Sequence, residues 1–275
     1  MRAAIAAAGL FLAALVALGF LVLPIVAIFA HTSPANLASQ LTNPVVTDAL
    51  VVSLKTTAIA QTLVILFGTP TAYLLASRRF AGRSLVITLV ELPLVLPPAV
   101  AGLGLLVAFG RNGLLGSTFE AMGISIPFTQ TAVTLAVAFV ASPLYVRQAI
   151  AAFEAVDPNM VAASRTLGVG PTRTFFRVML PLARAGLAAG FALALARGLG
   201  EFGATIMFAG SLQGVTQTLP LAIYAEFDRN FDATLAMGAL LIVISAALLL
   251  TLKFSSLWQA SRQSSRSRSG LLGWS

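Results

Sequence analysis

The 275-residue sequence has no cysteine, one histidine and few charged residues. Without cysteine the chain has no disulfides and no thiol chemistry, and His31 has no second histidine or cysteine with which to share a metal. Only 9% of the residues are charged, against about 25% in an ordinary soluble domain. These absences argue against an intramembrane enzyme, which would need a catalytic thiol, a histidine constellation or paired aspartates within the membrane.

The sequence also lacks a nucleotide-binding loop. No G-x-x-x-x-G-K-[ST] pattern occurs, so the backbone cradle and the lysine that hold ATP phosphates are missing. A G-x-G-x-x-G pattern does occur at Gly198, Gly200 and Gly203. It lies inside an apolar run and follows no strand, whereas a dinucleotide site needs strand, turn and helix. The chain is therefore not expected to bind ATP itself.

Apolar residues are what the sequence has in excess: they make up 58% of it, and the mean hydropathy is +0.94. A helix needs roughly 20 apolar residues to cross a bilayer. The sequence therefore predicts an all-α, polytopic membrane protein with a single transmembrane domain over residues 1–275 and six spans, at 3–29, 50–76, 85–109, 129–151, 183–208 and 233–252.

The first apolar run allows two interpretations. It can be a retained helix, or a signal peptide whose basic start is Arg2. The run is longer than the usual apolar core of roughly 7–15 residues, and no small-x-small site ends it sharply, so the retained helix is favoured.

Basic residues indicate the orientation of the chain, because cytoplasmic loops are rich in arginine and lysine. Arginine and lysine are concentrated in every second loop between the predicted spans and near both termini. The remaining loops hold only Arg111 and Arg229. Both termini are therefore predicted to be cytoplasmic. The basic, serine-rich residues 255–275 are predicted to be a disordered tail, drawn to anionic lipid rather than to nucleic acid.

A long cytoplasmic loop is predicted at residues 153–181. Asp157 can cap a helix start, and Pro158 suits the first helical position. Gly168 suits a left-handed helix stop, and Gly170 with Pro171 restarts a second short helix that Pro181 separates from the next span. By composition alone the loop could lie on the lipid surface or project as a rigid knob towards a partner.

Two charges, Arg197 and Glu201, fall inside the predicted span 183–208. They lie one helical turn apart and can face each other, at roughly mid-membrane by the rise of about 1.5 Å per residue from Ala183. The pair could pin the span to a neighbour, or it could lie on a translocation path or gate. The nearby Gly203 allows unwinding or close packing, and Gly186 with Gly190 forms a G-x-x-x-G contact surface.

The predicted span 85–109 contains a second irregularity, where Glu91 precedes three prolines, Pro93, Pro97 and Pro98. Proline removes a backbone donor and kinks a helix. Broken backbone at membrane depth is tolerated where it is buried in protein or lines a cavity. The kink can therefore serve packing, or Glu91, Pro97 and Pro98 can line a pore.

Three stretches carry a resemblance to a known family. The loop stretch AASRTLGVGPTRTFFRVMLP resembles the coupling-loop motif of ABC importer permeases, with Gly168 at the family glycine and Ala163 at its first alanine. Ser164 replaces the second alanine, and Ala162 stands where the family has glutamate. Residues 92–116 and 196–210 resemble the molybdate-type branch, with sulfate permeases as close relatives.

The resemblance implies a type I importer fold and a permease that translocates a tetrahedral oxyanion, with molybdate favoured and tungstate and sulfate as alternatives. It implies no cofactor and no resident metal. It implies a homodimer, two cytoplasmic ATPases, an external oxyanion-binding protein and a bacterial or archaeal cytoplasmic (inner) membrane. The residues expected to couple to the ATPase are Ala162, Ala163, Ser164, Arg165, Thr166, Leu167, Gly168 and Gly170.

The residues expected along the path or at its gate are Glu91, Pro97, Pro98, Arg197, Glu201 and Gly203. An ion-coupled secondary transporter is the competing hypothesis, since a buried Arg–Glu pair could relay protons. It does not account for the long cytoplasmic loop.

Overall fold

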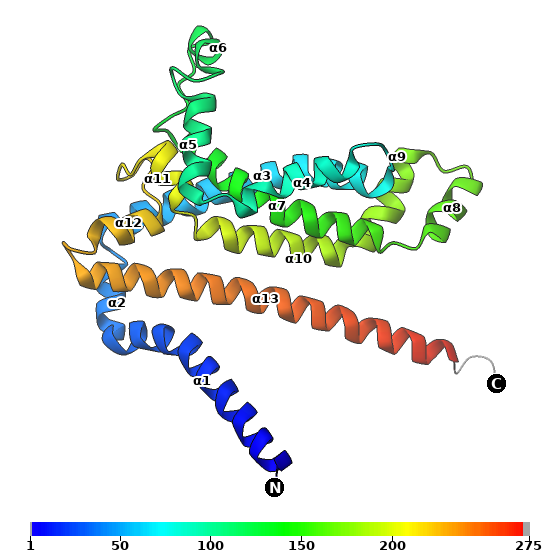
Figure 1. Cartoon of the computed structure of the whole chain (residues 1–275), viewed down its shortest axis with the longest axis horizontal. Coiled ribbons are helices and arrows are strands. Elements are labelled where there is room, and N and C mark those ends of the chain that lie inside the picture. The colour runs from blue at the N-terminus through cyan, green and yellow to red at the C-terminus, as the bar shows by residue number, and fades with distance from the viewer. Residues whose placement is uncertain (1, 272–275) are drawn as a thin grey trace.

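The structure is a computed structural model that describes residues 2–271, with side chains described at residues 6, 7 and 9–251. Within these residues every regular element is a helix (Figure 1). The elements are α1 (Arg2–His31), α2 (Pro34–Gln40), α3 (Pro44–Ser77), α4 (Arg83–Val95), α5 (Pro98–Phe109), α6 (Gly116–Ala121), α7 (Gln130–Glu154), α8 (Pro158–Thr166), α9 (Pro171–Thr174), the π-helical turn η1 (Phe175–Met179), α10 (Leu180–Leu199), α11 (Gly203–Ala209), α12 (Leu219–Glu226) and α13 (Phe231–Leu271).

Among the described residues, five helices are long and apolar enough to cross a membrane, or six if the bent pair α4 and α5 forms one span. The expected all-α polytopic fold is therefore confirmed. The predicted span 85–109 is not one straight helix, because the chain bends by 114° between α4 and α5.

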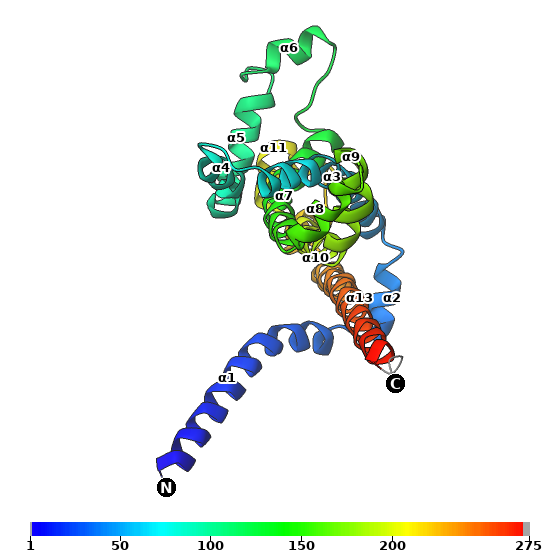
Figure 2. The same cartoon turned by 90° about the vertical axis from the view of Figure 1, so that its right-hand side faces the viewer.

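Helices α3, α7 and α10 form the core of the bundle, and α13 runs alongside them (Figure 1). Helices α8 and α9 lie at one end of the bundle, and α2, α11 and α12 lie at the other. Helix α1 leaves the bundle in one direction, while α5 and α6 form an arm that leaves it in another (Figure 2). The apolar part of α1 is unburied.

Small residues allow α7 and α10 to pack closely. A methyl group on Gly186 would lie 2.5 Å from Cβ of Ala152, and one on Gly190 would lie 3.0 Å from Cβ of Gln148. The first distance is too short for a real side chain and the second is tighter than most contacts, so the predicted G-x-x-x-G contact surface is confirmed, with α7 as its partner.

Capping side chains followed by proline set several helix starts. The Asn43 side chain accepts a hydrogen bond from the backbone N–H of Val45 at 3.0 Å, and Pro44 occupies the first helical position. Asp157 and Pro158 repeat this arrangement at the start of α8, as the sequence predicts. Proline is tolerated there because the first N–H groups of a helix have no partner inside the helix.

The helix that leads out of the loop does not break at Pro181. Residues Pro171–Leu199 form one continuous helix, so the predicted break is wrong. Proline lacks the N–H for an i→i−4 bond and crowds the carbonyl one turn earlier. The π turn η1 lies directly before Pro181, and Leu180 N–H bonds to Phe175 O across it. This wider turn accommodates the proline without ending the helix.

Helix α13 continues to Leu271, so most of residues 255–275 is helical where the sequence predicted a disordered tail. Extending an existing helix adds a hydrogen bond for each residue fixed, whereas starting one is costly. A segment too polar to fold alone can therefore extend the apolar helix that precedes it.

Candidate functional site

A break in the chain separates α10 from α11. Helix α10 ends at Leu199 and α11 begins at Gly203, so the predicted span 183–208 is interrupted at the glycines where unwinding was expected to be possible. Glycine disfavours helix by about 1 kcal/mol relative to alanine, and Gly198, Gly200 and Gly203 are concentrated here. The helix begins at Pro171, so Arg197 lies about 39 Å along it, close to the end of the helix.

Glu201 lies in this break and is almost wholly buried. Its Oε2 lies 2.7 Å from Nη1 of Arg197, and the two side chains are 1% and 32% exposed. The distance is that of an ion pair, although the groups are not aligned for a hydrogen bond. The predicted face-to-face pairing of the two charges is thus present.

The same carboxylate also holds the start of α11. The backbone N–H of Ala204 donates to Oε1 of Glu201 at 2.7 Å. A carboxylate near the first N–H groups of a helix satisfies a free donor there. Glu201 therefore ties the end of α10, through Arg197, to the start of α11.

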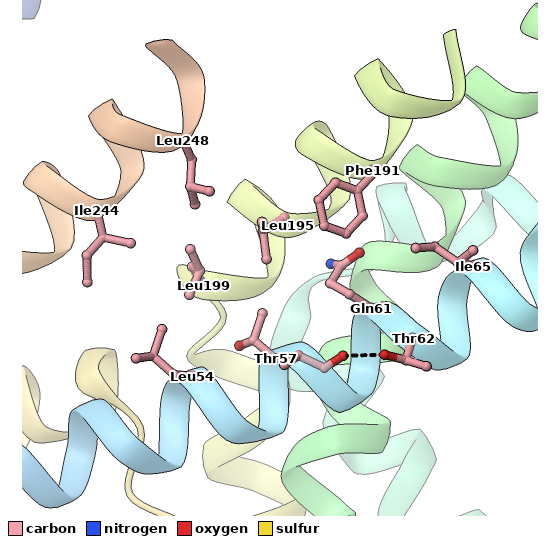
Figure 3. Close-up of a pocket in the computed structure, with 11 residues that line it drawn as sticks. Leu54, Thr57, Gln61, Thr62, Ile65, Phe191, Leu195, Leu199, Ile244 and Leu248 are labelled. Carbon is pink, nitrogen blue, oxygen red and sulfur yellow. Dashed lines mark hydrogen bonds between the residues drawn. The ribbon is translucent and has the colours of Figure 1, made fainter. Parts of the chain in front are cut away.

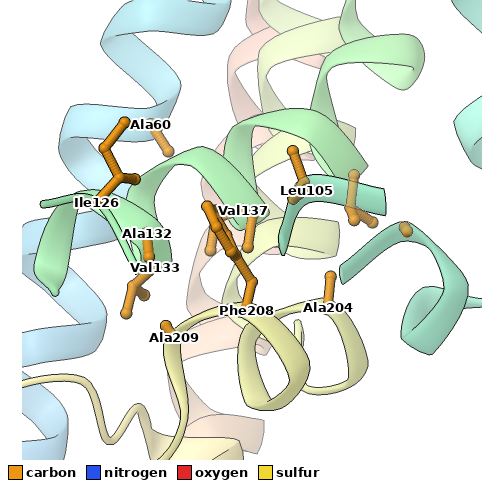
Figure 4. Close-up of a cluster of buried hydrophobic side chains, with 12 residues drawn as sticks. Ala60, Leu105, Ile126, Ala132, Val133, Val137, Ala204, Phe208 and Ala209 are labelled. Carbon is orange, nitrogen blue, oxygen red and sulfur yellow. The ribbon is translucent and has the colours of Figure 1, made fainter. Parts of the chain in front are cut away.

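Helix α11 lies against α5 with almost no side chain between the two backbones. A methyl group on Gly203 would lie 2.7 Å from Cβ of Pro98, and one on Gly102 would lie 2.6 Å from the carbonyl oxygen of Ala204. The structure thus brings together Pro98 and Gly203, two residues expected at the gate. Ala204 joins Leu105, Val137 and Phe208 in the apolar cluster beside this contact (Figure 4).

Gly102 and Ala204 were not singled out from the sequence. The signal that could have found Gly102 is the run of small residues AVAG that follows Pro98, since small residues let helices approach closely. Nothing in the sequence alone assigns the partner of that run.

A second break, at Leu96 and Pro97, separates α4 from α5. Pro97 and Pro98 are exposed in the single chain, as is Val95 before them. Glu91 lies on α4 one turn before the break, with Oε1 3.5 Å from Nε of Arg147 on α7. Glu91 is therefore paired with Arg147, and Arg197 is paired with Glu201.

The long loop forms two short helices joined by a tight turn. Gly168 has φ +78°, the left-handed conformation predicted for it. The hydroxyl groups of Ser164 on α8 and Thr174 on α9 lie 3.2 Å apart, and both residues are buried. Ser164, which replaces a family alanine, thus joins the two helices. Thr174 was not expected to contribute.

Aromatic packing holds this loop to the bundle. The ring of Phe175 lies 4.6 Å from that of Tyr73 on α3 and 6.0 Å from that of Phe153 on α7, measured between centroids. At the tip, Leu167 is 83% exposed and Met160 is 51% exposed. Ala162, Ala163, Arg165, Thr166 and Gly170 are also exposed. An anchored base and a tip that exposes Leu167 and Met160 fit a loop that contacts another protein.

Among the described residues, no group of three or more histidine, aspartate or glutamate side chains could hold a metal ion. The fold and the site define a polytopic helical membrane protein with two interrupted helices and a projecting helix–turn–helix loop. Residues 65–264 match the family model of binding-protein-dependent transport system inner membrane components. The chain belongs to this family.

Several relatives of the chain are named for molybdenum transport. The molybdenum transport system permease protein ModB of Mycobacterium tuberculosis is 44% identical over 241 residues, 87% of this chain and 91% of the relative. ModB of Escherichia coli K12 is 40% identical over 81% of this chain and 96% of its own. A probable molybdenum ABC transporter permease of Haloferax volcanii is 39% identical over 84% of this chain and 83% of its own.

Solved structures of ABC transporters share the fold. The chain matches one from a bacterial ABC transporter for the polysaccharide alginate with a TM-score of 0.66 and 17% identity, covering 95% of this chain and 96% of the other. It matches one from the methionine ABC transporter MetNI with a TM-score of 0.59 and 18% identity, covering 76% of this chain and 93% of the other.

Proposed function

We propose that this chain is the permease subunit of an ATP-driven ABC importer and that it translocates molybdate across the cytoplasmic membrane. The support for the cargo is the identity of 39–44% to relatives named for molybdenum transport. Tungstate and sulfate are tetrahedral dianions of the same kind, so the external binding protein makes the main selection and the permease supplies the path.

The observation that carries the transport mechanism is the loop of α8 and α9. Its tip residues 162–168 are exposed except for Ser164, and its base is held by Tyr73, Phe153 and Phe175. A cytoplasmic ATPase that binds Leu167 and its neighbours would transmit its own movement to α9. Because α9 and α10 are one continuous helix, that movement would reach Arg197 at the far end of the helix.

The proposed gate is the region where the two breaks meet. Gly203 and Pro98 are in direct contact there, and Arg197 with Glu201 fixes the angle at the α10–α11 break. Packed interfaces switch between discrete arrangements rather than deforming continuously. A movement of α10 would therefore separate α11 from α5 and open a path lined by Pro97, Pro98 and Gly203, with Glu91 nearer the loop end.

A second copy of the chain and two ATPases complete the proposed assembly. Broken backbone at membrane depth must be buried in protein or line a wet cavity, yet Pro97 and Pro98 are exposed in the single chain. In a homodimer with a central path, Pro97 and Pro98 would be covered by the second copy or would line the water-filled path. The arginine pattern supports a cytoplasmic location for both termini and for the loop of α8 and α9, with the binding protein on the opposite side.

Reconstitution tests this proposal. Proteoliposomes that contain the permease and its ATPase, with binding protein outside and ATP inside, should accumulate molybdate, and unlabelled tungstate should compete more strongly than sulfate. Uptake should survive collapse of the proton gradient and stop without ATP. Uptake that follows the proton gradient and ignores ATP would instead identify an ion-coupled transporter.

A further inference from the structure

A lateral cavity of about 360 Å³ lies between α3, α10 and α13, away from the proposed gate contact between α5 and α11. Its walls are mainly aliphatic and aromatic, and its lining includes Leu54, Ile65, Phe191, Leu195 and Leu248 (Figure 3). Three polar side chains of α3 interrupt this wall: the hydroxyl groups of Thr57 and Thr62 and the amide of Gln61.

The Gln61 amide has no hydrogen-bond partner. The residue is 3% exposed, and neither Nε2 nor Oε1 is bonded. Figure 3 shows the amide directed from α3 toward α10, beside Phe191 and Leu195. On its α10 side it meets the bare backbone of Gly198, where an added methyl group would lie 3.6 Å from Nε2. A buried amide without a partner is costly, so a hydrogen-bonding group that reaches Gln61 would be stabilised there.

The position of Gln61 restricts what that occupant can be. It lies 17 residues from the start of α3 and 16 from its end, about 25 Å from each by the helical rise, and so near the middle of the span. A charged headgroup is costly at that depth. An amide both donates and accepts, which matches a hydroxyl or a protonated carboxyl.

We propose that this cavity is a binding site for an uncharged single-chain amphiphile, whose aliphatic chain fills the space between α3, α10 and α13 and whose hydroxyl or protonated carboxyl bonds to the amide of Gln61. The bound molecule contacts Leu199, the last residue of α10 before the break. The site is independent of the cargo that the transporter carries.

Photolabelling of the whole transporter in lipid nanodiscs tests the site. A diazirine derivative of 1-octanol should label peptides of α3, α10 and α13 at the cavity, and unlabelled 1-octanol should displace it. Gln61→Leu should weaken labelling about two- to tenfold, the range for one net hydrogen bond. Thr62→Val is the matched control, because the Thr62 hydroxyl lines the same cavity but already donates to Ala58 O at 2.9 Å. It should leave labelling unchanged.

Further probes separate the alternatives. A diazirine fatty acid distinguishes a preference for carboxyl from one for hydroxyl, and failure of both probes to label the cavity would overturn the site. A diazirine alkane that labels as strongly as the alcohol probe would show that the amide does not recognise the hydroxyl. Undiminished labelling of the Gln61→Leu protein would show the same. Labelling by a diazirine phospholipid chain that 1-octanol cannot displace would identify ordinary bilayer lipid instead. Leu248→Phe, which narrows the cavity from the α13 side and away from the amide, should also reduce labelling by the alcohol.

Discussion

Gly203 and Pro98 touch so closely that a methyl group on Gly203 would lie 2.7 Å from Cβ of Pro98 and 3.2 Å from the backbone nitrogen of Ala99. These two residues belong to different broken helices and are separated by more than 100 positions in the chain. Their contact joins the two irregular segments into one unit. The gate proposed above depends on this contact being able to open and close.

Gly203→Ala should therefore destabilise the closed arrangement by about 1–3 kcal/mol, the usual range for overpacking. Thermal unfolding of the purified transporter should occur at a lower temperature, and ATP-driven uptake should fall. Gly104→Ala is the control, because nothing lies within 4 Å of a methyl group at that position on α5. An unchanged unfolding temperature for Gly203→Ala would mean that α5 and α11 are not in contact in the membrane.

The Arg197–Glu201 pair should respond unequally to removal of its members. Arg197→Ala leaves the 1% exposed carboxylate of Glu201 without its partner, and breaking a buried pair in this way costs about 3–5 kcal/mol. Glu201→Gln should cost less, because the 32% exposed Arg197 can reach water and the amide oxygen can still accept from Ala204 N–H.

The double variant Arg197→Ala with Glu201→Gln should regain stability relative to Arg197→Ala alone. Unfolding temperatures in detergent measure the three differences, and molybdate uptake in proteoliposomes measures their effect on transport. Near-normal uptake by both single variants would show that the pair does not take part in translocation and has only a structural role.

Gly168→Val should uncouple ATP hydrolysis from uptake. The left-handed backbone at φ +78° costs a β-branched residue about 1–2 kcal/mol, so the turn between α8 and α9 should rearrange. Hydrolysis in the presence of loaded binding protein, divided by molybdate imported, gives the coupling ratio.

Gly123→Val introduces the same kind of strain at φ +69° outside the loop, again with nothing within 4 Å. It should leave the ratio unaltered. Deletion of residues 168–170 should have a larger effect than Gly168→Val. Substrate-stimulated hydrolysis that stays coupled to uptake in the deletion variant would rule out this loop as the lever.

Leu167→Cys should crosslink to the ATPase. The chain has no cysteine of its own, so a single introduced thiol reports on one position without background. Leu167 is 83% exposed at the tip of the loop. Leu114→Cys is the matched control, since it is 84% exposed on the arm between α5 and α6.

A bifunctional thiol–amine reagent should join the ATPase to the first variant and not to the second. The reverse pattern would invert the proposed orientation of the chain in the membrane. If neither variant forms a crosslink, the loop does not contact the ATPase.

The sequence by itself determined the class of the protein and several of its helix starts and turns. Length and apolarity of the runs determined the helices, because a bilayer admits few other spanning structures. Asp157 with Pro158 and the left-handed Gly168 determined the loop, because capping and backbone sterics act over only a few residues. The i,i+4 spacing likewise determined that Arg197 and Glu201 could meet.

Only the tertiary structure decided where the spans are interrupted and what the interruptions touch. Local sequence patterns do not predict the contact of Gly203 with Pro98 or the hydrogen bond from Ala204 N–H to Glu201. They also do not predict that the helix continues through Pro181. A glycine or a proline permits a break or a kink, but whether the helix yields depends on the energy of packing against distant segments. Residues far apart in sequence supply that energy, and no local pattern encodes which of them will meet.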